Sequence, residues 1–155
     1  MLACTACMLI CVAISANHAF AGGGDNYKVY LNKKLILSQE HVTTATASIG
    51  YLPIDKLTEN DEVIVQYTHC GEAGKGRSIV LKDEKGNILK EWKFADVASS
   101  SMTIPVKDIL AIKKKNPNVA MNLYYFSSRF LPNGRMLASL KTEKKDLAKN
   151  EEVLM

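Results

Sequence analysis

The sequence predicts an all-β fold, an antiparallel β-sandwich of about 8–9 short strands with one short helix. Short segments with alternating apolar and polar residues recur along the chain, and turn-forming residues separate them roughly every ten residues. Only one stretch, residues 106–117, has apolar residues at helical spacing. No long amphipathic helix is therefore available to cover a parallel sheet. A β-barrel is the alternative arrangement of the same strands.

The first half of the chain contains four segments with strand character, which are residues 27–31, 35–39, 41–49 and 62–69. Alternation is clearest in the first and the last of them, where Tyr27 shares a face with Val29 and Val63 shares a face with Val65. The turn-forming residues between the first two segments predict a hairpin. The third is predicted as a strand because it is rich in β-branched residues. Pro53 interrupts the chain before the last segment.

The second half contains five further segments, which are residues 77–83, 88–94, 101–106, 118–128 and 135–142. The first two are predicted to continue the strand at 62–69 as a three-stranded meander, with a glycine loop and a Gly-Asn turn as connections. Residues 129–134, which include a proline and a glycine, are predicted to separate the last two. The one predicted helix is 106–117, and its lysines 113–115 sit where cations complement the C-terminal helix dipole.

Residues 1–21 predict a cleaved secretory signal peptide. They carry no Asp, Glu, Lys or Arg, and their apolar run is shorter than the roughly 20 residues that span a bilayer. The small residues Ala19 and Ala21 predict cleavage after Ala21 and export, to the periplasm or as a secreted protein. The alternative is a lipoprotein modified at Cys11, which the bulky Ile10 before it disfavours.

The predicted mature chain is a single β-sandwich domain over residues 27–142. A flexible glycine-rich leader, 22–26, is expected before it, and a solvated or frayed tail, 143–155, after it. Cys70 is then the one cysteine left, so an internal disulfide is excluded and burial must stabilise the fold. A disulfide-linked dimer through Cys70 is the covalent partnership that such a lone exported thiol offers.

The charge distribution argues against nucleic-acid binding. The net charge is +4, and the lysines are scattered among acidic residues. Arginines occur at Arg77, Arg129 and Arg135, widely spaced in the sequence, whereas a nucleic-acid surface would cluster basic residues on one face. No motif indicates a cofactor, and no transmembrane segment is expected in the mature chain.

Four segments carry a resemblance to known proteins, and they are residues 67–96, 102–109, 123–128 and 134–140. With their order and spacing, the chain resembles an uncharacterised family of small exported bacterial β-rich proteins. The resemblance covers most of the mature chain and implies export and a single domain. It implies no activity, cofactor or catalytic residue.

The residues with the most chemistry lie around Cys70. A cysteine nucleophile needs a base within about 3 Å, but alternation along a strand sends the side chains of His69 and Cys70 to opposite faces, which leaves His41 as the other candidate base. Metal binding is not indicated, because these three residues lack paired spacing such as C-x-x-C. A redox role for the thiol would rely on the nearby cations Lys75 and Arg77.

The glycine loop 70–76 allows two further interpretations. Its glycines would let backbone N–H groups converge on an anion, with Lys75 and Arg77 adding charge. A nucleotide-binding P-loop is excluded, because the lysine precedes the last glycine and a strand follows instead of a helix. The plain interpretation is a hairpin connection with Cys70 buried and His69 at the rim, and the sequence favours it.

The segment 118–128 alternates large side chains onto both faces, which predicts a central strand covered on two sides. Alternatively, Tyr124, Phe126, Arg129 and Phe130 would line a ligand or carbohydrate surface, since exposed aromatic residues often mark binding.

Two functions follow from the sequence. The first is an exported non-enzymatic β-sandwich that binds or assembles with an unidentified protein or small ligand, because no convincing catalytic constellation is present and loops at one end could carry recognition. The second is a thiol-dependent enzyme or redox protein centred on Cys70, with His69 as its candidate partner.

Overall fold

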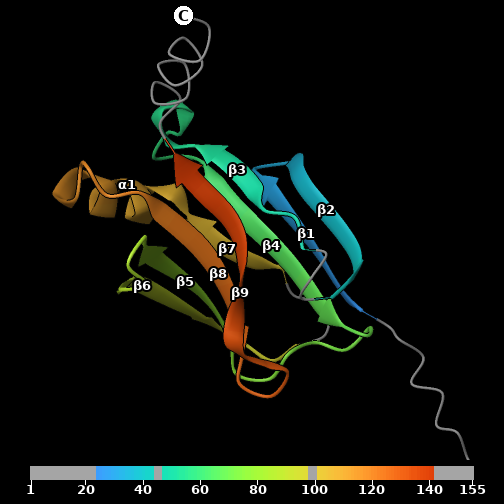
Figure 1. Ribbon diagram of the computed structural model, residues 1–155. Helices are drawn as coiled ribbons and strands as arrows, with labels where there is room; N and C mark the ends of the chain where they lie inside the picture. Colours follow the sequence, from blue (N-terminus) through green and yellow to red (C-terminus); the bar gives the residue numbers. More distant parts are fainter. Residues whose placement is uncertain (1–23, 44–46, 98–100, 142–155) are drawn as a thin grey trace, which may run out of the picture.

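The structure is a computed structural model that describes residues 24–43, 47–97 and 101–141 (Figure 1). The predicted signal peptide and the predicted C-terminal tail lie outside these residues. The elements are β1 Asp25–Leu31, β2 Lys34–Val42, β3 Gly50–Pro53, η1 Ile54–Lys56, β4 Glu62–His69, β5 Arg77–Asp83, β6 Ile88–Phe94, β7 Met102–Pro105, α1 Val106–Lys115, β8 Met121–Ser127 and β9 Leu131–Lys141.

The strands form two sheets, and the predicted sandwich is confirmed. One sheet has four strands in the order β2-β1-β4-β7, and the other has five in the order β3-β9-β8-β5-β6. The sheets are open, so the alternative of a closed barrel is wrong. Every strand pair is antiparallel except β3–β9, which is parallel because the short β3 returns to the edge of the second sheet.

Alternate residues of both sheets point into one shared core. In β4, buried Val63 and Val65 flank half-buried Ile64, and in β8 buried Leu123 precedes half-buried Tyr124. The two-residue period that identified these strands in the sequence is therefore the period of burial.

The α-helix α1 closes the core at one edge of the sandwich. It follows β7 directly after Pro105, which lacks the N–H that a longer strand would need. Val106 and Ile109 are fully buried in the core. The indole Nε1 of Trp92 in β6 donates to Asp108 of α1 at 3.1 Å. The helix thus leads from β7, an edge strand of the first sheet, to β8 in the second sheet, and it contacts the edge strand β6 through Trp92 (Figure 1).

The predicted meander is wrong, because β4 and β5 lie in different sheets. Of the three strands of the predicted meander, β4, β5 and β6, only β5 and β6 pair with each other as a hairpin. The glycine loop between His69 and Arg77 therefore crosses from one sheet to the other at an end of the sandwich. Within it, His69 and Glu72 exchange backbone hydrogen bonds of 2.8 and 2.9 Å, with Cys70 and Gly71 at positive φ as the turn residues between them.

Three predicted boundaries also differ from the structure. The strand predicted at 41–49 ends at Val42, after His41 takes a left-handed φ of 53°, and residues 44–46 lie outside the description. Strand β9 already begins at Leu131, so the turn between the last two strands is shorter than predicted. The expected leader 22–26 contributes its last two residues to β1, where the carboxylate of Asp25 finds partners in both sheets.

The core gives a first testable prediction. Leu123→Ala removes a fully buried side chain and should lower the free energy of unfolding by about 2–5 kcal/mol, because the cavity refills only in part. Leu35→Ala on the edge strand β2, where the side chain is 47% exposed, is the control and should cost less than about 0.5 kcal/mol. Urea denaturation monitored by circular dichroism measures both, and equal losses would contradict the core assignment.

Candidate functional site

The outer side of the five-stranded sheet carries a set of half-exposed large side chains that we call the aromatic face: Tyr51, Lys82, Tyr124, Phe126 and Met136. They come from four neighbouring strands, and the register aligns them. Tyr51 is level with Ser139, which is level with Asn122, and Asn122 is level with Lys82. In the next row, Met136 and Tyr124 are cross-strand partners.

A cation–π contact organises the middle of the aromatic face. The ammonium of Lys82 lies 4.9 Å from the ring centroid of Tyr124 and 4.7 Å from that of Phe126. The two ring centroids are 6.4 Å apart. Phe126 lies so close to Gly134 that a Cβ there would come within 2.4 Å of the ring, and Gly134 also has φ +72°. A glycine is thus required under the Phe126 ring.

Strand β8 is central in its sheet, as predicted, but the expected cover on both sides is wrong. Its inward side chains are fully buried, whereas Tyr124 and Phe126 are half-buried among the side chains of the neighbouring strands. Val80 of β5 also faces outward and is nevertheless buried, since it pairs with Tyr124 on one side and with Glu91 on the other. On the outer face, Val80 is therefore covered by its neighbours, whereas Tyr124 and Phe126 remain partly exposed to solvent.

A groove of about 460 Å³ lies on this face beside the edge strand; we call it the β3 groove. Its lining residues come from the beginning of β3, from β8 and β9, and from the segments just before β3, after β5 and before β8; they are Ile49, Gly50, Tyr51, Glu84, Ala120, Asn122, Met136, Ser139 and Lys141. Ile49 is 52% exposed and Tyr51 is 39% exposed, so large apolar side chains border the groove.

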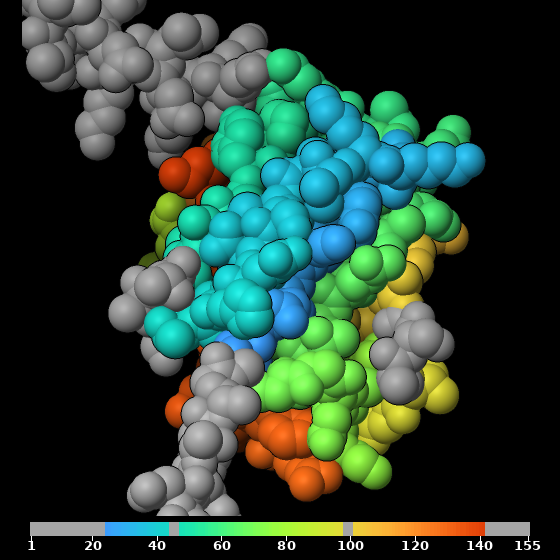
Figure 2. Space-filling view, turned by 90° about the vertical axis from the view of Figure 1, so that its right-hand side faces the viewer, coloured from blue at the N-terminus to red at the C-terminus, as the bar shows by residue number. Residues whose placement is uncertain are grey.

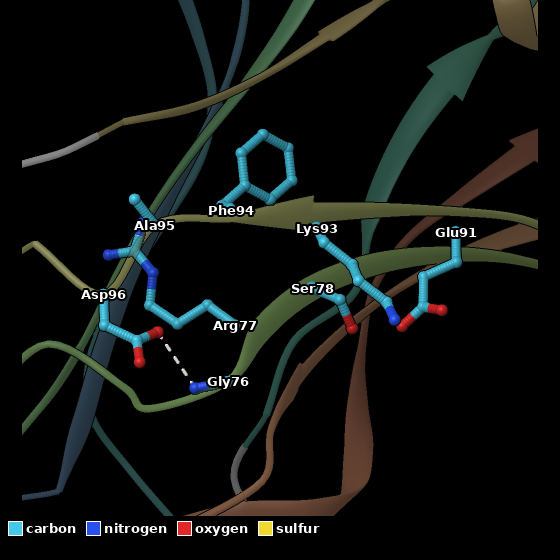
Figure 3. A pocket seen from close by; sticks show the side chains of 8 residues that line it. All are labelled: Gly76, Arg77, Ser78, Glu91, Lys93, Phe94, Ala95 and Asp96. Atoms are coloured by element: carbon cyan, nitrogen blue, oxygen red, sulfur yellow. Dashed lines mark hydrogen bonds between the residues drawn. The ribbon is translucent and has the colours of Figure 1, made fainter.

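A second depression lies at the edge formed by β5 and β6 (Figure 3). Figure 3 shows the Lys93 ammonium beside the side chains of Ser78 and Glu91, whereas the Arg77 guanidinium lies apart from them, toward Ala95. Arg77 is 98% buried and donates from Nη1 to the carbonyl oxygen of Val97 at 3.2 Å. Its charge therefore faces the interior and does not converge with that of Lys93.

Arg129 and Phe130 lie in the turn between β8 and β9, away from the outer face. The Phe130 ring stacks on His69 at a centroid distance of 4.9 Å, and the Arg129 guanidinium lies over Phe130 at 4.8 Å. Of the four residues predicted to share a ligand surface, the structure thus brings Tyr124 and Phe126 together. Phe130 and Arg129 cover an end of the sandwich instead.

Between the sheets lies a polar group of side chains, the inter-sheet cluster, composed of Asp25, Tyr67, His69, Tyr125 and Arg135. The Asp25 carboxylate accepts from Tyr67 at 2.7 Å and from Arg135 at 2.9 Å, and its other oxygen lies 2.9 Å from His69 Nδ1. Arg135 also donates to the Tyr67 hydroxyl at 2.6 Å. The Tyr125 hydroxyl lies 3.2 Å from His69 Nε2 and so extends the cluster to β8.

The aromatic rings of this cluster are also in direct contact with one another. Tyr67 stacks on Tyr125 with centroids 4.0 Å apart and on Tyr27 with centroids 5.4 Å apart. Burial raises the pKa of Tyr67, and its hydrogen bond to Asp25 raises that pKa further, against the opposing charge of Arg135. Burial also raises the pKa of Tyr125 to about 12. Both phenols therefore stay neutral at physiological pH and act as hydrogen-bonding groups.

The burial of the inter-sheet cluster limits the chemistry that its side chains can perform. A carboxylate, an imidazole and a hydroxyl in line are the parts of a proton relay. Here the hydroxyl is a phenol of raised pKa, and the imidazole is 95% buried beneath Phe130. A substrate would have no access to either group, so the arrangement fits an inter-sheet tie better than a catalytic site.

The glycine loop packs against the end of β8. A Cβ on Gly74 would come within 2.3 Å of the Tyr125 hydroxyl, and one on Gly76 within 2.4 Å of the Ser128 hydroxyl. The Lys75 N–H donates to Ser127 Oγ at 3.1 Å, and the Gly76 N–H donates to a carboxylate oxygen of Asp96 at 2.9 Å. These glycines permit close approach between backbone and side chains.

The predicted anion site at Lys75 and Arg77 therefore gains no support from the geometry. The two loop N–H groups that would face an anion already have protein acceptors, and the Arg77 charge is buried.

The structure also reverses the expected burial of two neighbours. Cys70 is exposed at the tip of its turn with φ +52°, and His69 is buried inside the cluster. Strand β4 ends at His69 and Cys70 lies in the turn that follows, so the turn, and not alternation along a strand, separates the buried imidazole from the exposed thiol. His41, the other candidate base, is exposed near the end of β2, where its N–H donates to Asn26.

The described residues contain no group of three His, Cys, Asp or Glu side chains that could hold a metal ion. Among the same residues, no helix is long and apolar enough to cross a membrane.

Comparison of the chain with known protein families finds no matching family, and comparison with curated proteins finds no match either. The resemblance to an exported β-rich family gains no support from this result.

Sequence reasoning missed several residues of both sites. Asp25 was placed in the leader, and Arg135 carried no signal beyond its charge. Its inward direction follows from pairing with Tyr125 across the β8–β9 ladder, where a register shift nearby hides the alternation. Tyr51 and Met136 belong to the aromatic face only because β3 joins the sheet through a parallel pair, which local patterns do not reveal.

The inter-sheet cluster predicts the effect of losing one hydroxyl. Tyr67→Phe removes the donor to Asp25 and the acceptor for Arg135 inside the sandwich, and should lower the free energy of unfolding by about 1–3 kcal/mol. Tyr30→Phe, at a half-buried outward position of β1, is the matched control and should cost less than about 0.5 kcal/mol. Urea denaturation at neutral pH compares them; an equal cost for the two would show that the cluster adds nothing.

The raised pKa of Tyr125 predicts a loss of stability in alkali. The folded protein holds this phenol neutral up to about pH 12, whereas an unfolded tyrosine ionises near about pH 10. The resulting stability is complete below pH 10 and is lost as the pH rises from 10 through 12. Urea midpoints between pH 8 and 11.5 should fall, and they should fall less steeply in Tyr125→Phe. A midpoint independent of pH across this interval would disprove it.

Proposed function

We propose that this protein is an exported, non-enzymatic binding module that recognises its partner through the aromatic face. The observation that carries the proposal is the alignment of Tyr51, Tyr124, Phe126 and Met136, half-exposed, on three adjacent strands of one sheet. Exposed aromatic groups on an ordered scaffold are typical of recognition surfaces. Export rests on residues 1–21, whose composition matches a signal peptide.

The inner side of the same sheet supports the non-enzymatic part of the proposal. The groups with catalytic potential are gathered in the inter-sheet cluster, where His69 and Asp25 hydrogen-bond to each other and to residues of the facing sheet. They stabilise the sandwich and leave the outer face for binding.

The thiol-dependent alternative has no comparable support. Cys70 is exposed, but the imidazole of His69 points into the interior and is engaged by Asp25 and Tyr125. An imidazole held in this way is not positioned to take the proton of the exposed thiol. Because Cys70 is exposed, rapid alkylation would report accessibility and would not by itself indicate catalysis.

The proposal predicts which surface loses binding when it is altered. The mature chain, immobilised and exposed to the envelope and medium fractions of the exporting cell, should retain a partner. The double variant Tyr124→Ser/Phe126→Ser should retain at least tenfold less, because it removes the aromatic surface without touching the inter-sheet cluster. The matched control is Tyr30→Ser/Leu35→Ser on the outside of the four-stranded sheet, where β2, β1 and β4 form a continuous surface of side chains (Figure 2).

Circular dichroism must show that both double variants are folded before the comparison is made. Equal retention by the wild type and the Tyr124→Ser/Phe126→Ser variant would reject the aromatic face as the recognition surface. Loss in the control alone would move the surface to the four-stranded sheet.

A further inference from the structure

We infer that the β3 groove is a saccharide-binding site that holds a neutral sugar ring against Tyr51. The inference rests on the proposed function, since it assigns a ligand class to one part of the aromatic face. Three features of the groove carry it: a bordering aromatic ring, polar side chains with unused hydrogen-bonding capacity, and a balanced charge.

The first feature is the apolar surface. Tyr51 faces outward from β3 and exposes 39% of its surface, Ile49 exposes 52%, and Met136 adds a half-buried thioether beside them. A flat ring bordered by aliphatic groups offers a platform for another flat, weakly polar surface. The C–H-rich face of a pyranose ring is such a surface. Because Tyr51 sits on a strand, its backbone is fixed and little entropy is lost on binding.

The second feature is polar capacity. Asn122 and Ser139 are cross-strand neighbours in β8 and β9 and line the groove next to Tyr51. Within the described part of the chain, neither side chain forms a hydrogen bond, and the same holds for Glu84 and Lys141 at the ends of the groove. An amide, a hydroxyl, a carboxylate and an ammonium together provide donors and acceptors for ring hydroxyls. In the inter-sheet cluster, by contrast, the polar side chains are bonded to one another.

The third feature is charge. The lining contains one carboxylate, Glu84, and one ammonium, Lys141, so its formal charge is zero. A polyanion would gain no net electrostatic attraction from a groove in which Glu84 offsets Lys141. A hydrocarbon chain would cover Asn122 and Ser139 and leave their polar groups unpaired, at a cost of about 1–3 kcal/mol for each such group. A neutral ligand with an apolar face and a hydroxylated edge avoids both penalties.

The volume of the groove is compatible with this ligand class. At about 460 Å³ it lies within the range of about 300–1,000 Å³ that is typical of small-molecule sites. Beyond it, Tyr124 and Lys82 continue the aromatic face toward β5. A chain of linked sugars that begins in the groove would therefore meet further aromatic surface along the sheet.

The test uses the full mature chain labelled with ¹⁵N and three neutral hexasaccharides as probes: cellohexaose, maltohexaose and N-acetylchitohexaose. At millimolar concentration, at least one should shift the amide resonances of residues 49–51, 122, 136 and 139, and leave those of the four-stranded sheet unchanged. Tyr51→Ala should weaken that affinity at least tenfold, Tyr51→Phe should retain it, and Leu35→Ala is the matched exposed control. A loss in Tyr51→Ala without a loss in Tyr51→Phe assigns the effect to the ring.

Several outcomes would overturn the inference. They are no shifts with any of the three probes, shifts confined to other surfaces, unaltered affinity in a folded Tyr51→Ala variant, or shifts at these amides with a random hexapeptide mixture alone. The proposed function stands or falls separately. If the envelope partner is lost in Tyr124→Ser/Phe126→Ser while no saccharide binds, the aromatic face is retained and only its ligand class is wrong.

Discussion

The alignment of the two sheets depends on the carboxylate of Asp25. Its partners, Tyr67 and His69 from the first sheet and Arg135 from the second, fix one sheet against the other. A hydrophobic core alone is non-directional and tolerates sliding between sheets. Charge-assisted hydrogen bonds are directional and therefore resist such sliding. Because Arg135 and Tyr125 are cross-strand partners in the facing sheet, holding them also fixes the register that aligns the outer face.

The inner and outer faces of β8 and β9 therefore have complementary roles. Tyr125 and Arg135 point inward and are satisfied by Asp25, His69 and Tyr67. Their neighbours Tyr124 and Met136 point outward and contribute to the aromatic face. A shift of the strand register by one residue would exchange the inward and outward side chains and place the guanidinium of Arg135 in solvent. The buried polar cluster thus specifies which side of the sheet faces the interior and which side faces solvent.

The sequence predicted those elements that are defined by the local spacing of apolar residues. The strands β1, β4, β5, β6 and β8 and the helix follow from alternation, helical spacing and turn residues. What depends on sheet membership was not predictable. Nothing local says that the chain crosses between sheets after His69, that β3 pairs in parallel with β9, or that Arg135 meets Asp25 across 110 positions. Tyr124 and Phe126 were found from their residue type, whereas Tyr51 required the topology.

The edge strands of the sheets argue for a sheet face, and against a sheet edge, as the proposed recognition surface. Two of the four edge strands, β3 and β7, have only four residues each and end in a proline, Pro53 and Pro105. A third, β6, carries Lys90 and Lys93, and the pairing of β2 with β1 contains two register shifts. Proline, lysine, short length and irregular register each discourage another strand from adding to an edge. With edge pairing discouraged in these ways, the proposed recognition relies on side-chain contact with the outer face and not on strand addition.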